Sequence, residues 1–292
     1  MSGRAWAATI WFGAMLFLGP LKFGNSANAR WTVFIPHGLW ELLAAAWSAT
    51  IVPVAAGIGL LLALLAADSR RTATILHRYR YCWGPAALLA GVALVGLLHS
   101  SSLEEATSFI AHLLGVAVFA VAVLLHLGNH PRSRTVMLAC WLAGLGCLCL
   151  HTVVQAHWGF QELYDNLQRL AVYNERQVNS RLLDNLRKGR AMANFTISNS
   201  LGAHLVLVTP PAVAVIWRWC RKVEPPRPAQ VVICTLAGGL LLYCLYLTRS
   251  RGALLGLPLG VAGAGAVFAA ARWRDLDAEG RRRMLTAAAV VA

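Results

Sequence analysis

The sequence predicts an all-α integral membrane protein, a multi-spanning helical bundle, and three observations support this prediction. Of the 292 residues, 58% are hydrophobic and 13% are charged, whereas about a quarter of the residues in a soluble domain are charged. The apolar residues gather in runs of about 20, the length at which an α-helix crosses the hydrocarbon core of a bilayer. The formal net charge of +14 comes from short basic clusters between those runs, which is typical of cytoplasmic loops rather than of a nucleic-acid-binding surface.

The apolar runs predict about eight complete transmembrane helices in a single polytopic membrane domain that covers residues 1–292. The runs are Trp6 to Leu21, Leu39 to Ala67, Cys82 to Leu98, Thr107 to Leu127, Val136 to Trp158, Asn199 to Trp217, Ala229 to Leu247 and Gly252 to Ala271. A ninth run begins at Met284 and reaches Ala292, which is too short to cross a bilayer. We therefore expect the chain to be C-terminally truncated.

The basic residues predict a cytoplasmic N-terminus. Alternate loops are rich in them, namely the loops with Arg70, Arg71, Arg78 and Arg80, with Arg132 and Arg134, with Arg218, Arg221, Lys222 and Arg227, and with Arg272, Arg274, Arg281, Arg282 and Arg283. Under the positive-inside rule these loops face the cytoplasm. The long loop 159–198 then lies outside, and helical spacing of its apolar residues predicts an amphipathic helix at the interface. Alternatively, the first run is a signal peptide that is cleaved after Ala27 to Ala29, which leaves the later helices oriented the same way.

Two basic groups fall at the outer ends of predicted helices. Arg249 and Arg251 form a hairpin tip between the seventh and eighth runs, and Arg190 with Lys188 precedes the sixth. Guanidinium groups suit phosphate because they offer a planar fork of donors and stay charged. The two groups could therefore bind a diphosphate, although interfacial arginines can also simply reach lipid head groups. Glycines at every fourth position, Gly252, Gly256 and Gly260, are expected to let the tip pack closely against a neighbouring helix.

These residues resemble the motifs of the O-antigen ligase and polymerase superfamily. The segment TRSRGALLGL, Thr248 to Leu257, is similar to that family's S-R-G-A motif, in which Ser250, Arg251 and Gly252 open a transmembrane helix on the periplasmic side. The segment from Gly189 to Pro211 resembles an earlier motif of the family. Its matching residues are Arg190, Ala193, Phe195, Asn199 and Gly202, with Ala193 where the family usually has glycine and Ser198 where it usually has proline.

The resemblance implies a bacterial inner-membrane glycosyltransferase whose active face is periplasmic. Family members transfer a glycan from an undecaprenyl diphosphate carrier to an acceptor lipid, glycan or protein, without a metal or other cofactor. Arg190 and Arg251 would be catalytic and would bind the donor diphosphate together with Arg249 and Lys188, supported by Phe195, Asn199, Ser250 and Gly252. The family's general base is a histidine in a large C-terminal periplasmic loop. That loop would lie beyond Ala292, so the resemblance nominates no histidine of this chain and implies that residues 1–292 alone are inactive.

Two other classes of protein remain as alternatives. A lipid-linked oligosaccharide flippase or another membrane transporter would also be basic and multi-spanning, but it should carry charges deep within its helices. A non-catalytic membrane scaffold would tolerate loss of Arg190 or Arg251. The seven cysteines lie in apolar runs or at their ends, so we expect neither a disulfide framework nor a metal-binding CxxC motif.

Overall fold

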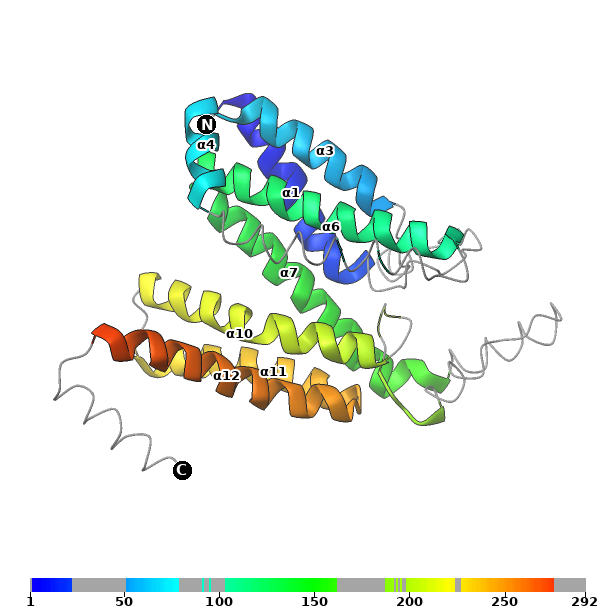
Figure 1. Cartoon of the computed structure of the whole chain (residues 1–292). Coiled ribbons are helices and arrows are strands. Elements are labelled where there is room, and N and C mark those ends of the chain that lie inside the picture. Colours follow the sequence, from blue (N-terminus) through cyan, green and yellow to red (C-terminus); the bar gives the residue numbers. More distant parts are fainter. Residues whose placement is uncertain are drawn as a thin grey trace. The chain divides into compact units, whose positions relative to one another are not determined.

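The described part of the computed structural model consists of helices and the turns between them (Figure 1). It describes residues 2–22, 51–78, 91, 95, 103–161, 187–191, 193, 195, 198–223 and 227–275. These residues fall in two compact units, Met1–Leu201 (unit 1) and Gly202–Ala292 (unit 2). The described ranges contain no strand, so the prediction of an all-α fold is confirmed for them.

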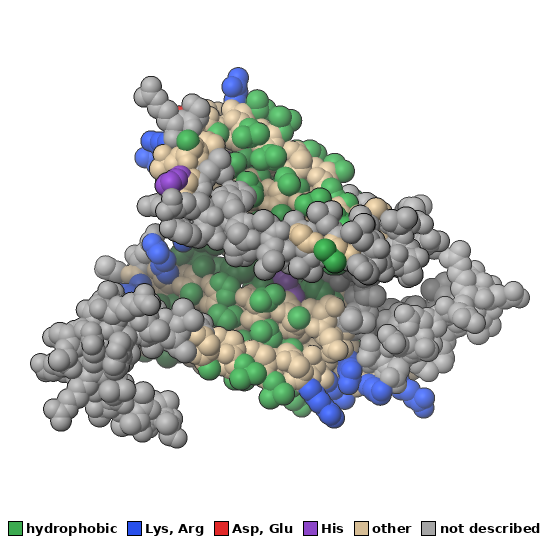
Figure 2. All heavy atoms as spheres, viewed as in Figure 1, with side chains coloured by type: hydrophobic (Ala, Val, Ile, Leu, Met, Phe, Trp, Pro, Cys, Tyr) green, Lys and Arg blue, Asp and Glu red, His purple; other side chains and the backbone are tan. Residues whose placement is uncertain are grey.

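Five of the described helices are long and apolar enough to cross a membrane. They cover Gly3–Lys22, Phe109–Asn129, Ser133–Gly159, Ser198–Arg221 and Pro228–Leu247, and the helix Ile51–Ala66 is apolar but shorter. Hydrophobic side chains cover the visible sides of the helices, and lysines and arginines gather toward the helix ends (Figure 2). This distribution is that of a membrane protein. The third and ninth predicted runs and most of the loop 159–198 lie outside the described residues, except for residues 91 and 95, which are helical.

In its described residues, unit 1 is built around three long helices and a shorter one. They are α1 (Gly3–Lys22), α3 (Ile51–Ala66), α6 (Leu103–Asn129) and α7 (Ser133–Val154), and α7 continues into a π-helical turn, η1 (Gln155–Gly159). Phe12 of α1 is fully buried among Ala63, Ala122 and Met137. Small residues let the helices approach one another closely, because a Cβ atom at Gly144 would collide with the backbone carbonyl of Phe17. Such packing is usual where helices associate within a membrane.

A short polar helix, α4 (Ser69–Arg78), was not predicted from the sequence. Its residue Ile75 packs so tightly on α6 that a Cβ atom at Gly128 would collide with it. At this end of unit 1, the Asn129 side chain accepts a hydrogen bond from the N–H of Asp68 at 3.1 Å, and Nε2 of His130 lies 2.9 Å from the carbonyl oxygen of Ala66. The α3–α4 and α6–α7 turns therefore share one end of unit 1, as the predicted alternation of basic loops requires.

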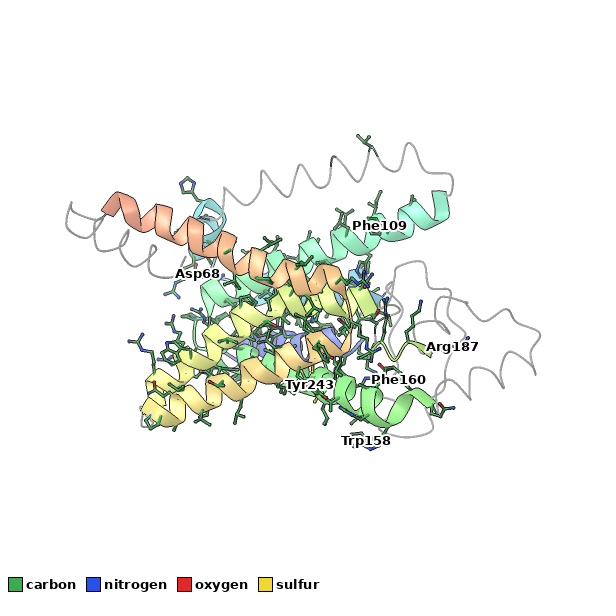
Figure 3. The ribbon with its side chains drawn as sticks, turned by 90° about the horizontal axis from the view of Figure 1, so that it is seen from below. Asp68, Phe109, Trp158, Phe160, Arg187 and Tyr243 are labelled. Carbon is green, nitrogen blue, oxygen red and sulfur yellow. The ribbon has the colours of Figure 1, made fainter. Side chains whose placement is uncertain are left out.

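The other end of unit 1 carries the end of α7 and the segment that leads to α10. Figure 3 shows Trp158 and Phe160 at the end of the α7 helix and Arg187 on that segment, with Asp68 at the opposite end. Lys22 follows the first predicted run, Trp6 to Leu21, but it belongs to the last turn of α1 and is 2% exposed.

The described part of unit 2 consists of long helices. Helix α10 (Ser198–Val223) begins at the end of unit 1 and runs into unit 2, where α11 (Arg227–Leu247) and α12 (Arg251–Asp275) follow. The side chains of Cys234 on α11 and Cys220 on α10 lie near each other, and a Cβ atom at Gly238 would lie 3.8 Å from Val213. The predicted starts of the sixth and eighth runs, Asn199 and Gly252, each lie one residue from the observed helix starts.

Candidate functional site

The turn between α11 and α12 is held by the hydroxyl groups of Thr248 and Ser250. The Thr248 hydroxyl donates to the carbonyl oxygen of Leu245 at 2.7 Å and accepts from the N–H of Ser250 at 3.2 Å. Ser250 immediately precedes α12, and its Oγ accepts from the N–H of Ala253 at 3.4 Å, which is the hydrogen bond of an N-cap. Both side chains are buried. Two buried hydroxyls therefore fix the shape of the turn.

This turn determines where Arg249 and Arg251 stand. Arg251 is the first residue of α12, and its side chain is exposed. Arg249 has a φ of 49°, a left-handed conformation that usually selects glycine after a helix, and its side chain is also exposed. A residue other than glycine costs on the order of 1 kcal/mol there. Such strained positions occur often at functional sites, so the conformation of Arg249 marks this turn as a candidate.

Gly202, in the second turn of α10, lies directly against the same turn. A Cβ atom at Gly202 would stand 2.8 Å from Cβ of Ala253, 3.0 Å from Cβ of Ser250 and 3.2 Å from Oγ1 of Thr248. The first of these contacts is shorter than real Cβ atoms adopt, so a side chain at this position would require the helices to shift. A glycine of the first motif thus packs against the second motif within unit 2.

The predicted role of the glycines on α12 is wrong for the described neighbours. A Cβ atom at Gly252 or Gly260 would meet nothing within 4 Å among them, and one at Gly256 would only reach Val206 at 4.0 Å. Gly252 and Gly260 are exposed. The spacing correctly identified a bare face, but the close approach is made by Gly202 on α10, because α12 turns Ala253 toward that helix.

The segment around Arg190 is bent by two residues with left-handed backbone. Gly189 has a φ of 60° and Ala193 a φ of 47°, and between them Ala191 is fully buried. Arg190 is half-buried, whereas the side chains of Arg187 and Lys188 are exposed. A left-handed φ suits glycine best, which agrees with the glycine that the resembling motif usually has where Ala193 stands. Arg190 is thus the one predicted arginine that the described structure partly encloses.

Gln155 holds this segment from the end of α7, and the sequence analysis missed it. The side-chain oxygen Oε1 of Gln155 accepts a hydrogen bond of 2.7 Å from the N–H of Ala193, 38 residues away in the chain. Gln155 is 7% exposed and begins the π-helical turn η1. Single π-turns within α-helices frequently mark functional sites. A lone amide within the apolar run from Val136 to Trp158 was the only sequence signal that could have indicated it.

The remaining predicted site residues lie close to these two turns in the chain. Phe195 is half-buried, and Asn199 is exposed in the first turn of α10. The structure brings Gly202, Thr248, Ser250 and Ala253 together. The Arg190 segment belongs to unit 1 and Arg251 to unit 2.

The described side chains form no metal-binding site. Within the described ranges, no three His, Cys, Asp or Glu side chains gather as they would around a metal ion. His126 is buried in α6, where its Nε2 lies 2.9 Å from the Thr9 hydroxyl of α1, and its ring lies 5.3 Å from that of Phe12 between centroids. These contacts give His126 a packing role between α1 and α6.

Comparison of the chain with protein-family models, with curated proteins and with solved structures finds no match. The likeness to the O-antigen ligase and polymerase superfamily therefore rests on the two sequence motifs alone.

Proposed function

We propose that the protein is a metal-independent membrane glycosyltransferase of the O-antigen ligase or polymerase type. It would transfer a glycan from an undecaprenyl-diphosphate-linked donor to an acceptor lipid, glycan or protein. The observation that carries this proposal is the turn from Thr248 to Ala253, which two buried hydroxyls hold in shape and which Gly202 allows to pack on α10. Such a turn presents Arg251 in a fixed position, as a binding site for a charged group requires.

Helix geometry favours an anion beside Arg251. The first N–H groups of a helix lack partners within the helix, and the helix dipole adds partial positive charge at the same end. Arg251 is the first residue of α12, and the second turn of α10 packs beside it at Gly202. Phosphate groups bind readily at such helix starts. The guanidinium of Arg251 would then add bidentate donors to the backbone groups.

Arg190 would supply the second guanidinium. Its partial burial removes some of the water that would otherwise screen its charge, which strengthens its attraction for a phosphate. The two bends at Gly189 and Ala193 restrict the backbone on both sides of it. Lys188 and Arg249 are exposed, and we propose for them a supporting role in attracting the anionic donor.

The reaction is a substitution at the anomeric carbon of the donor sugar. An acceptor hydroxyl or amine attacks that carbon, its proton passes to a general base, and the bond between carbon and diphosphate oxygen breaks. The lipid diphosphate leaves with the electron pair, so negative charge develops on it in the transition state. Arg190 and Arg251 would stabilise that charge, and each well-placed donor of this kind is worth about 3 to 4 kcal/mol. We assign the base to no described residue.

The proposed location is the inner membrane of a bacterium, with the site at the periplasmic face. The basic residues Arg71, Arg132 and Arg134 lie within or beside the α3–α4 and α6–α7 turns, which share one end of unit 1, whereas the segment with Arg190 leaves from the other end (Figure 3). The excess of basic residues in short loops marks the first end as cytoplasmic under the positive-inside rule.

A lipid-linked oligosaccharide flippase is the alternative, and one observation favours it. Lys22 is 2% exposed within α1, and buried charges inside membrane helices often mark transport pathways. The residue lies in the last turn of α1, however, where a lysine can reach the interface. We therefore prefer the transferase.

Measurements of donor binding and of donor transport distinguish the transferase from the flippase. We expect the 292-residue chain in lipid nanodiscs to bind an undecaprenyl-diphosphate-linked glycan, with an affinity that EDTA does not change. In proteoliposomes the same chain should not move the labelled donor between leaflets. Failure to bind the donor would refute the transferase proposal, and protein-dependent movement of the donor would favour the flippase.

A further inference from the structure

We infer that Gln155 is a positioning residue, which holds the turn that carries Arg190 in the conformation used to bind the donor diphosphate. The inference rests on the proposed function for the role of Arg190. It adds a residue from the end of α7, which neither motif contains and to which we assign no contact with the donor.

The hydrogen bond from Ala193 to Gln155 has the geometry of a strong contact. Its length is 2.7 Å, at the short end of the range for N–H donors and oxygen acceptors. Gln155 is 7% exposed, so water competes little for the carbonyl oxygen of its side chain. A buried amide that lost this partner would leave polar atoms unsatisfied, which is costly. The bond is therefore an effective anchor for the backbone at Ala193.

The hydrogen bond is made by Ala193, the residue of this segment whose backbone conformation is least favourable for its side chain. Ala193 has a φ of 47°, a conformation that alanine adopts only when its surroundings impose it. The N–H that Gln155 accepts belongs to this same residue. The hydrogen bond thus holds a bend that the alanine backbone alone disfavours. Loss of the bond should release the bend, and Arg190 lies three residues earlier in the same short segment.

The π-helical turn explains how Gln155 reaches Ala193. An α-helix places successive side chains at 100° intervals, and a π-turn inserts a residue that rotates the side chains at its site. The turn begins at Gln155 and ends at Gly159, where α7 reaches the end of unit 1 that carries the Arg190 segment (Figure 3). The widened turn therefore lies at the place where the Gln155 side chain accepts the hydrogen bond from Ala193.

Hydrogen exchange tests the anchor without reference to activity. Gln155→Met keeps the length of the side chain and removes the acceptor, so the amide of Ala193 should exchange about tenfold faster. Gln155→Glu keeps an acceptor oxygen and should preserve most of the protection. Gln161→Met makes the same substitution at an exposed position near the end of α7 and should change nothing at Ala193. Unchanged exchange in Gln155→Met would overturn the inference.

Donor affinity then tests the purpose of the anchor. Gln155→Met should weaken binding of the undecaprenyl-diphosphate-linked glycan about tenfold in the otherwise native chain, since a misplaced group loses much of its contribution. In an Arg190→Gln background the same change should alter the affinity less than about twofold, because coupled residues are not additive. An equal loss in both backgrounds would overturn the positioning role.

The two measurements distinguish failure of this inference from failure of the proposed function. If the native chain does not bind the donor while the exchange at Ala193 responds to Gln155→Met, the proposed function is wrong and Gln155 still fixes the turn. If the native chain binds the donor, and Gln155→Met changes neither the hydrogen exchange at Ala193 nor the donor affinity, the inference is wrong and the proposed function stands.

Discussion

Arg251→Gln should weaken binding of the undecaprenyl-diphosphate-linked donor by about 10- to 100-fold. Hydrogen bonds to charged groups contribute about 1.5 to 3 kcal/mol, and glutamine removes both the charge and the planar fork of donors. Arg251→Lys should recover part of the loss, because it restores charge without bidentate geometry. The affinity is measured in nanodiscs by titration with a fluorescent donor.

The control for this substitution is Arg218→Gln. Arg218 lies near the C-terminal end of α10, whereas the start of α10 is the part that packs beside the turn with Arg251. Arg218 is also exposed, so both variants lose one charge from the surface of unit 2. Donor affinity should be unchanged in Arg218→Gln. Equal weakening in the two variants would mean that donor affinity depends only on the net charge of the protein. That result would contradict a specific role for Arg251.

Gly202→Ala should destabilise unit 2 by about 1 to 3 kcal/mol, the usual cost of overpacking. The added Cβ atom would stand 2.8 Å from Cβ of Ala253 and 3.0 Å from Cβ of Ser250, and neither atom can move without its backbone. The start of α12 would therefore shift and carry Arg251 with it. We expect a lower midpoint of thermal unfolding in detergent together with weaker donor binding.

Gly239→Ala is the matched control because it makes the same change in another helix of unit 2. A Cβ atom at Gly239 meets nothing within 4 Å among the described residues. This substitution should leave the unfolding midpoint unchanged or raise it, since alanine has the higher helix propensity. A midpoint for Gly202→Ala that matches that of Gly239→Ala would show that the contact between α10 and the Thr248 turn is not tight.

The helices could be predicted from the sequence because their cause is local. A run of apolar residues long enough to cross a bilayer has few alternatives to a helix, since its backbone groups must pair within the segment. The structure accordingly contains helices at the predicted runs within its described ranges. The helix α4 was missed because it is short and polar. It depends on a contact that the sequence does not show, the packing of Ile75 against Gly128 of α6.

The candidate site could be predicted only in part, because much of it depends on contacts between distant segments. The sequence indicated Arg251 and Ser250 at the start of a helix, and the structure has them there. Gln155 stood out in the sequence only as a lone amide in an apolar run, and its partner lies 38 residues away. The glycine spacing on α12 identified a bare face but not the neighbour, and the close contact belongs to Gly202 instead.

The most direct test of the two-arginine proposal is the ratio of affinities for a diphosphate-linked and a monophosphate-linked lipid of the same chain length. A pair of guanidinium groups that bind one diphosphate should favour it over the monophosphate by at least about tenfold in the native chain. The preference should disappear in the Arg190→Gln, Arg251→Gln double variant. A native chain without the preference, or a double variant that keeps it, would contradict the proposal.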